Sequence, residues 1–190
     1  MFEVKVLNES GYDHAIEGIG LSYNIKDKER LKKVAFKLTD KDGGHNKFLE
    51  SMVVWLEIRA SRFFWQEADT YRVGTTKQSE STIHTITKKT LDENDFTENV
   101  YYGFIDYLNE LIHDYRKATD DMEKDFIFRC IKENLPEGFL QTRIVCTNYK
   151  TLRNMIWQRK NHKLVEWHMF IDELSHQLEH SDILFKGFNK

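Results

Sequence analysis

The chain has 190 residues, of which 40% are apolar and 13% aromatic, and its formal net charge is −3. This length and composition exclude a disordered chain and are sufficient for one compact domain with a hydrophobic core. The near-neutral charge argues against a binder of nucleic-acid polymers, because contacts to phosphate backbones require a basic surface.

The two cysteines, Cys130 and Cys146, provide neither a disulfide framework nor the ligand spacing of a zinc site. We expect both to be ordinary packing residues in a reduced, cytoplasmic protein. The N-terminus lacks the basic and apolar regions of a signal peptide, and no apolar run approaches the roughly 20 residues that cross a bilayer. The sequence therefore predicts a soluble protein that is not exported and has no membrane partner.

Hydrophobic periodicity predicts the elements of the first half of the chain. Period-two alternation indicates strands, apolar residues at helical spacing indicate helices, and paired glycines indicate a turn. In chain order we expect a strand over 2–7, helices over 13–23 and 27–38, a turn at Asp42-Gly43-Gly44, a strand over 52–58, a short helix over 61–67 and a polar loop over 73–81.

The second half is dominated by helical patterns. The clearest helix covers 95–117, with an apolar stripe formed by Phe104, Tyr107, Leu108, Leu111, Ile112 and Tyr115. After it we expect a helix over 122–133 that Asn134-Leu135-Pro136 ends, a strand over 140–147, and helices over 151–159 and 163–178.

Strands early in the chain and helices later predict an α+β fold with a small, mostly antiparallel sheet packed with several helices. The chain contains no repeat and no linker-like segment, so we expect a single domain over 1–190. A sheet this small leaves strand edges and helix faces to bury, which favours oligomerisation.

Three collinear groups of residues resemble the motifs of flavin-dependent thymidylate synthases. They are Gly20-Leu21-Ser22-Tyr23; then Gly44-His45, Leu49-Glu50, Ser61-Arg62 and Thr70-Tyr71-Arg72; and finally Leu135-Pro136, Asn148-Tyr149-Lys150, Leu152, Asn154 and Arg159. Their spacing follows that family over nearly the whole chain, so we interpret the protein as a divergent member with that family's fold.

The resemblance implies a homotetramer whose active sites are built at subunit contacts. Each site holds flavin adenine dinucleotide (FAD) and a pyrimidine deoxynucleotide, deoxyuridine monophosphate (dUMP). The family transfers a one-carbon unit from methylenetetrahydrofolate to the uracil ring, the reduced flavin supplies the hydride, and NADPH reduces the flavin. A small, proline-poor version is expected of a bacteriophage, whose protein would then act in the host cytoplasm.

The resemblance also implies roles for individual residues. Arg159 matches an arginine that contacts the pyrimidine ring, where positive charge stabilises the negative charge that develops as C5 becomes nucleophilic. Lys150 replaces a family arginine and keeps the charge without the planar fork. The matched cofactor-binding positions are Ser22, His45, Glu50, Arg72, Asn148, Lys150 and Asn154. The matched substrate-binding positions are Glu67, Gln78, Ser79, Ser81, Lys132 and Arg159.

Individually, several of these residues also fit structural roles: Ser22, Asn148 and Asn154 as caps or turn residues, His45 as a loop histidine, and Lys132 as a solvated lysine at a helix end. We expect Asn148 in the turn before a helix and Asn154 within that helix. Among the other histidines, His176 and His180 lie one helical turn apart but lack a third convincing ligand, so no metal site is predicted.

The nucleotide-binding motif departs from the family pattern. Of its Arg-His-Arg triplet only Arg72 remains, and its closing Ser-x-Arg becomes Glu80-Ser81-Thr82. Loss of one charged contact costs about 1.5–3 kcal/mol. Three alternatives follow. The protein acts on a different pyrimidine nucleotide or adds a hydroxymethyl group; it is a synthase whose phosphate is held by Lys77, Lys132 or Arg143; or it is a non-catalytic relative that binds a flavin, a nucleotide or a protein partner.

Overall fold

The computed structural model describes residues 2–41 and 43–188. Within them the chain forms two compact units. We call the first the α5–α6 unit; it comprises Phe2, Arg59–Ala68 and Ser79–Arg143. We call the second the α7–α8 unit; it comprises 3–58, 69–78 and 144–188.

One four-stranded sheet has the strand order β1-β2-β4-β3. The strands are β1 (Glu3–Ser10), β2 (Val53–Ser61), β3 (Thr76–Ser79) and β4 (Leu140–Asn148). Along β2 the side chains of Val54, Leu56 and Ile58 are buried while Trp55 and Glu57 are exposed, which is the period-two pattern of a sheet with one face in the core. The predicted α+β class with a small, mostly antiparallel sheet is confirmed.

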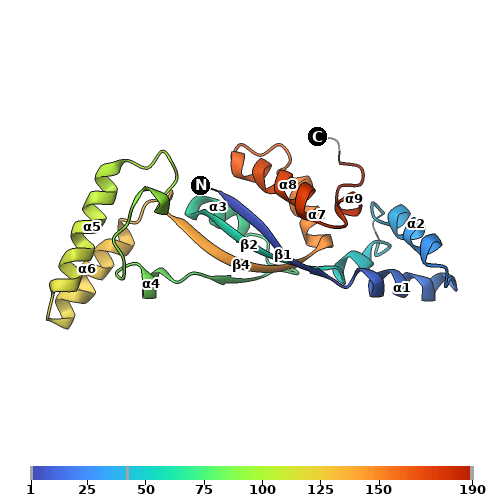
Figure 1. The fold of residues 1–190 in the computed structure, drawn as a ribbon, viewed down its shortest axis with the longest axis horizontal. Helices are drawn as coiled ribbons and strands as arrows, with labels where there is room; N and C mark the ends of the chain where they lie inside the picture. The colour runs from blue at the N-terminus through green and yellow to red at the C-terminus, as the bar shows by residue number, and fades with distance from the viewer. Residues whose placement is uncertain (1, 42, 189–190) are drawn as a thin grey trace. The chain divides into compact units, whose positions relative to one another are not determined.

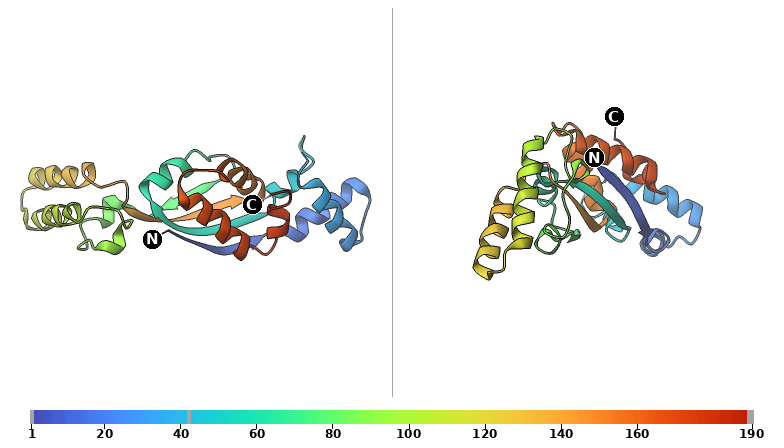
Figure 2. Two further views of the ribbon diagram at one scale, coloured as in Figure 1. Left: turned by 90° about the horizontal axis from the view of Figure 1, so that it is seen from above. Right: turned by 60° about the vertical axis from the view of Figure 1, so that its left-hand side comes forward.

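The α7–α8 unit contains the helices α1 (Tyr12–Tyr23), α2 (Lys28–Leu38), η1 (Lys47–Glu50), α7 (Tyr149–Arg159), α8 (Val165–Gln177) and α9 (Ser181–Leu184). Asp27 caps α2 by accepting a hydrogen bond from the Arg30 amide at 2.6 Å. Helices α1 and α2 pack against each other, α7 packs against η1, and α8 packs against β1 (Figures 1 and 2).

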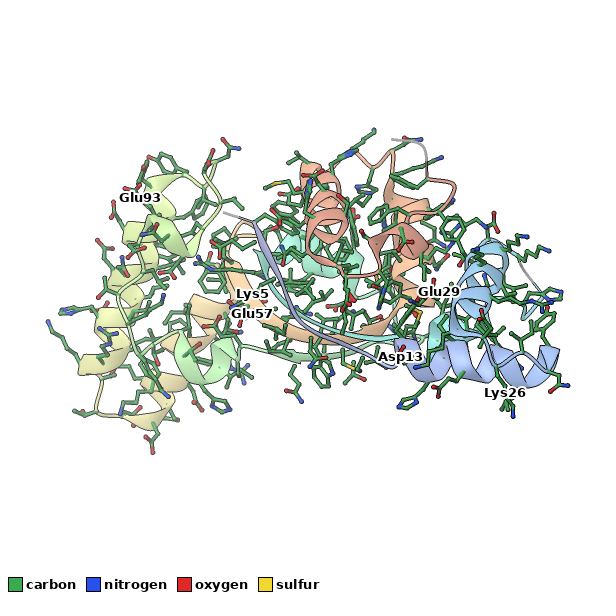
Figure 3. All side chains as sticks on the ribbon, turned by 45° about the vertical axis from the view of Figure 1, so that its right-hand side comes forward. Lys5, Asp13, Lys26, Glu29, Glu57 and Glu93 are labelled. Atoms are coloured by element: carbon green, nitrogen blue, oxygen red, sulfur yellow. The ribbon has the colours of Figure 1, made fainter. Side chains whose placement is uncertain are left out.

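A sharp corner joins β1 to α1 at Gly11. Its φ of 89° lies in the left-handed region, and a Cβ atom there would lie 2.2 Å from the backbone oxygen of Ser51. Only glycine fits this position, because the Cβ atom of any other residue would clash with the backbone of Ser51. Figure 3 labels Asp13 in the first turn of α1, directly after this corner.

The α5–α6 unit contains α3 (Arg62–Ala68), α4 (Thr82–Thr85), η2 (Glu93–Asp95), α5 (Tyr102–Lys117) and α6 (Asp121–Glu133). Helices α5 and α6 lie side by side in Figures 1 and 2, and bury Leu108, Ile112 and Ile131. Asp120 caps α6 by accepting from the Glu123 amide at 2.9 Å.

Two sequence predictions are wrong in part. Helix α5 begins at Tyr102 rather than at 95, because a capping box between Asp92 and Asp95 closes a 3-10 turn and Phe96 then pairs with Phe139 in a β-bridge. The polar segment 73–81 is not entirely loop, since Thr76–Ser79 forms the edge strand β3. An edge strand needs little apolar sequence, so the pattern gave no strand signal. The short helices α4 and α9 were also not predicted.

Gly43 and Gly44 form the expected turn with φ values of 71° and 82°, while Asp42 lies outside the described residues. Cys130 and Cys146 are both free thiols and half-buried. None of the helices in the described parts of the chain is long and apolar enough to cross a membrane.

Candidate functional site

A cavity of about 720 Å³ lies in the α7–α8 unit against α1, the Gly43-Gly44 turn and η1. Three residues singled out by the sequence motifs, Ser22, His45 and Glu50, line it together. Lys47 and Phe48 complete the wall beside them. The cavity therefore brings together residues from three separate segments, and its wall combines a hydroxyl, an imidazole, a carboxylate, an ammonium group and apolar side chains.

Hydrogen bonds of the buried Asn46 side chain hold the loop that carries His45. The Asn46 side chain is only 5% exposed; its amide donates to the Thr39 carbonyl at 3.1 Å. The ammonium of Lys150, in the first turn of α7, donates to the Asn46 side-chain oxygen. Lys150 thus contacts the residue that follows His45 in the sequence, and its charge is directed at Asn46.

Asn148 is the N-cap of α7, as expected, and accepts from the Thr151 amide at 2.9 Å. The loop that follows Arg72 packs directly on this cap: a Cβ atom on Gly74, whose φ is 67°, would lie 2.7 Å from the Asn148 amide nitrogen. Thr147 holds the same loop by donating to the Gly74 carbonyl at 3.1 Å. Arg72 itself is exposed beside this junction.

Asn154 lies within α7, as the sequence predicted, and is exposed. Its side-chain oxygen accepts from Gln158 at 3.0 Å.

Arg159, the last residue of α7, is held by aromatic groups. Its Nε donates to the Tyr71 hydroxyl at 2.9 Å, and that hydroxyl donates to the Gln158 side chain at 3.0 Å. The guanidinium also lies over the Trp167 ring, 4.9 Å from its centroid. Hydrogen bonding and cation–π contact together fix the orientation of this positive charge.

Helix α7 therefore connects the three groups of site residues within one unit: Lys150 near the cavity, Asn148 at the Arg72 loop, and Arg159 on Tyr71. Sequence reasoning missed Asn46 and Tyr71. Tyr71 stands at the histidine position of the Arg-His-Arg triplet, which was the available signal. No comparable pattern marked Asn46.

The predicted substrate residues fall in both units. Gln78 is an exposed residue of β3 in the α7–α8 unit, whereas Glu67, Ser79, Ser81 and Lys132 belong to the α5–α6 unit. There, Glu80 folds back on β4: its amide donates to the Thr142 carbonyl at 2.9 Å, and its carboxylate accepts from the Thr142 amide at 3.4 Å.

Lys132 contacts the altered end of the nucleotide motif. Its ammonium donates to the hydroxyl of Thr82, the residue that stands where the family motif ends in arginine. Burial lowers the pKa of Lys132, and the positive charge of Arg62 lowers it further. Two cations thus share this part of the α5–α6 unit next to Ser81 and Thr82.

Comparisons with known proteins agree with this geometry at the level of the fold. No protein-family model matches the chain, and no curated protein sequence matches it. A crystal structure of thymidylate synthase X from Helicobacter pylori with FAD and dUMP superposes with a TM-score of 0.73 and 18% identity over 98% of both chains. The chain has the fold of a flavin-dependent thymidylate synthase.

A second structure supports the same fold. The flavin-dependent thymidylate synthase of Helicobacter pylori complexed with FAD and dUMP aligns with a TM-score of 0.74 and 18% identity, covering 99% of this chain and 100% of that one. The fold expected from the sequence resemblance is thus the fold that both superpositions show.

Proposed function

We propose that the protein is an FAD-dependent enzyme that transfers a one-carbon unit to C5 of a pyrimidine deoxynucleotide. The preferred reaction is methylation of dUMP with methylenetetrahydrofolate and NADPH as co-substrates, with hydroxymethylation as the variant. The observation that carries the proposal is the cavity that Ser22, His45 and Glu50 line together. These three residues match the family motifs, and the fold aligns over 98% of the chain.

The chemistry of the cavity fits an FAD molecule. A dinucleotide needs cationic or hydrogen-bonding groups for its pyrophosphate, acceptors for ribose hydroxyls and ring N–H groups, and apolar surface for its rings. Here His45 and Lys47 suit the phosphates, Glu50 supplies an acceptor, and Ile19 and Phe48 supply apolar contact. The volume of about 720 Å³ lies within the usual range of small-molecule sites.

When bound and reduced, the flavin supplies the hydride. The protein's own contribution is placement and charge. Arg159 presents a positive charge in a fixed orientation, because the Tyr71 hydroxyl and the Trp167 ring hold its guanidinium. A preoriented cation stabilises negative charge that develops on the pyrimidine ring without the cost of reorganising in the transition state.

Of the three candidate cations Lys77, Lys132 and Arg143, we propose that Lys132 binds the nucleotide phosphate. Lys77 is already paired with Asp69 at 3.1 Å, and the Arg143 guanidinium lies over the Trp65 ring, 4.2 Å from its centroid. Lys132 instead reaches Thr82, beside the Ser81 hydroxyl. A lysine from α6 thus compensates for the arginine that the motif lacks.

We also propose that the protein assembles as a homotetramer in the cytoplasm. Helix α5, the residue before it and α6 expose several apolar and aromatic side chains, namely Tyr101, Tyr102, Phe104, Tyr107, Met122 and Phe126. Exposed aromatic side chains on a helical unit are typical of protein interfaces. Sedimentation or light scattering of the purified protein would test the assembly.

One experiment separates the enzyme from a non-catalytic relative. Protein reconstituted with FAD should absorb at about 450 nm and should convert dUMP in the presence of methylenetetrahydrofolate and NADPH, with mass spectrometry distinguishing methyl from hydroxymethyl products. Protein that gains no flavin absorbance would refute the flavin assignment. A yellow protein that binds no pyrimidine nucleotide would favour the non-catalytic alternative.

A further inference from the structure

Three side chains of metal-ligand type meet at a second place in the α7–α8 unit. Glu9, near the end of β1, lies with Glu179 and His180, in the junction between α8 and α9, so that one ligand atom of each is within 4.8 Å of the others. They line a cavity of about 460 Å³. His176 lies one helical turn before His180 in the sequence, but its side chain instead faces Asp172 at 3.6 Å.

Hydrogen bonds from Tyr149 and from the Glu179 amide orient the Glu9 carboxylate. The Tyr149 hydroxyl lies 3.0 and 3.1 Å from its two oxygens, and the Glu179 amide donates to it at 2.8 Å. A carboxylate has about four acceptor positions, which leaves one for a further partner. Such outer hydrogen bonds are typical of carboxylates that ligate metals.

The imidazole of His180 is also oriented. Its ring stacks on the Tyr12 ring with 3.6 Å between centroids and 20° between planes. Among the described residues, no side chain forms a hydrogen bond with this imidazole. A ring nitrogen therefore remains available to a ligand in the cavity.

The charge around the cluster favours a cation. Glu9, Asp13 and Glu179 all line the cavity, and over the described part of the chain neither glutamate forms an ion pair. The cation on the same wall, Lys32, is paired with Glu29 at 2.8 Å. Two unneutralised carboxylates beside an imidazole form a mixed nitrogen and oxygen set, which suits zinc-like transition metals better than magnesium or calcium.

We propose that Glu9, Glu179 and His180 bind one divalent transition-metal ion of the zinc class, with water in the remaining position. Ligand atoms about 2.1 Å from zinc lie at most about 4.2 Å apart, so the cluster must contract slightly. Glu179 is exposed, and rotation of its side chain provides this contraction. The ion clamps the end of β1 to the start of α9. The three proposed ligands do not line the candidate flavin cavity, although His14 borders both cavities.

The test uses full-length, chelator-treated protein and zinc ions alone as the probe in titration calorimetry. Wild type should bind one zinc ion per chain, whereas Glu179→Gln and His180→Gln should each weaken binding about 10- to 100-fold. His176→Gln is the matched control, because this exposed histidine lies four residues before His180 and outside the cluster. It should bind zinc as the wild type does.

Thermal unfolding provides the second readout. Zinc should raise the melting temperature of wild type and His176→Gln but not of His180→Gln, because only a folded, intact site binds the ion. Circular dichroism without zinc would verify that each variant is folded. Equal zinc binding by all variants would overturn the proposal in favour of scattered surface histidines. Absence of saturable binding would leave the cluster as a hydrogen-bonded tie between β1 and Tyr149 only.

Discussion

Replacing Asn46 by alanine should destabilise the protein and the candidate flavin cavity together. The change removes the acceptor of the Lys150 ammonium and leaves the Thr39 carbonyl, in a fully buried residue, without its side-chain donor. A buried acceptor left unsatisfied costs about 1–3 kcal/mol, and a hydrogen bond to a charged group contributes about 1.5–3 kcal/mol. Water at the partly exposed Lys150 recovers some of the second amount, so we expect a loss of about 2–4 kcal/mol.

Urea denaturation of Asn46→Ala would measure this loss directly, and FAD titration would measure the effect on the cavity. Lys150→Met is the matched control, because it removes the charge while the Asn46 to Thr39 hydrogen bond remains. It should cost about 1–2 kcal/mol, and the double variant should cost less than the sum of the two single changes. A loss below about 0.5 kcal/mol in Asn46→Ala, or strict additivity, would refute the idea that Lys150 acts through Asn46.

Three further predictions concern other contacts of the site. Tyr71→Phe keeps the ring but loses the hydroxyl that accepts from Arg159, and should lower kcat/KM about tenfold with FAD affinity unchanged. Lys132→Gln should raise the nucleotide Kd about tenfold or more in calorimetry. The lowered pKa of Lys132 means that its charged form destabilises the folded chain, so the stability of wild type relative to Lys132→Gln should rise as pH approaches about 10.4. Gly74→Ala places a Cβ atom against the α7 N-cap and should cost more than about 1 kcal/mol in urea denaturation, whereas Gly18→Ala, with open space around its Cβ within α1, should be neutral or stabilising.

Local signals explain which elements the sequence could predict. Helix α6 was expected over 122–133 and occurs as Asp121–Glu133, because its apolar periodicity coincides with a capping aspartate. The start of α5 could not be predicted, because Phe96 leaves the helical pattern to pair with Phe139, which is distant in sequence. Strand β3 depends in the same way on β4, the neighbour that it pairs with at the sheet edge.

In the candidate site, too, local sequence signals identified some residues, while contacts between distant segments could not be predicted. Motif spacing selected Ser22, His45 and Glu50, and these three line one cavity. The supporting contacts were beyond prediction, because Asn46 and Lys150 are 104 positions apart in the chain. Its motif position and its charge identified Lys150 as a cation for a cofactor, but only its neighbours in space determine where that charge is directed.

The glycine corner between β1 and α1 has a consequence for both proposed ligands. Ser51, whose carbonyl oxygen faces Gly11, borders the larger cavity, while Gly11 itself borders the smaller one, and His14 lines both. A displacement of this corner would therefore reshape two binding pockets at once. A single backbone position, without any side chain of its own, therefore shapes both the candidate flavin cavity and the proposed metal site.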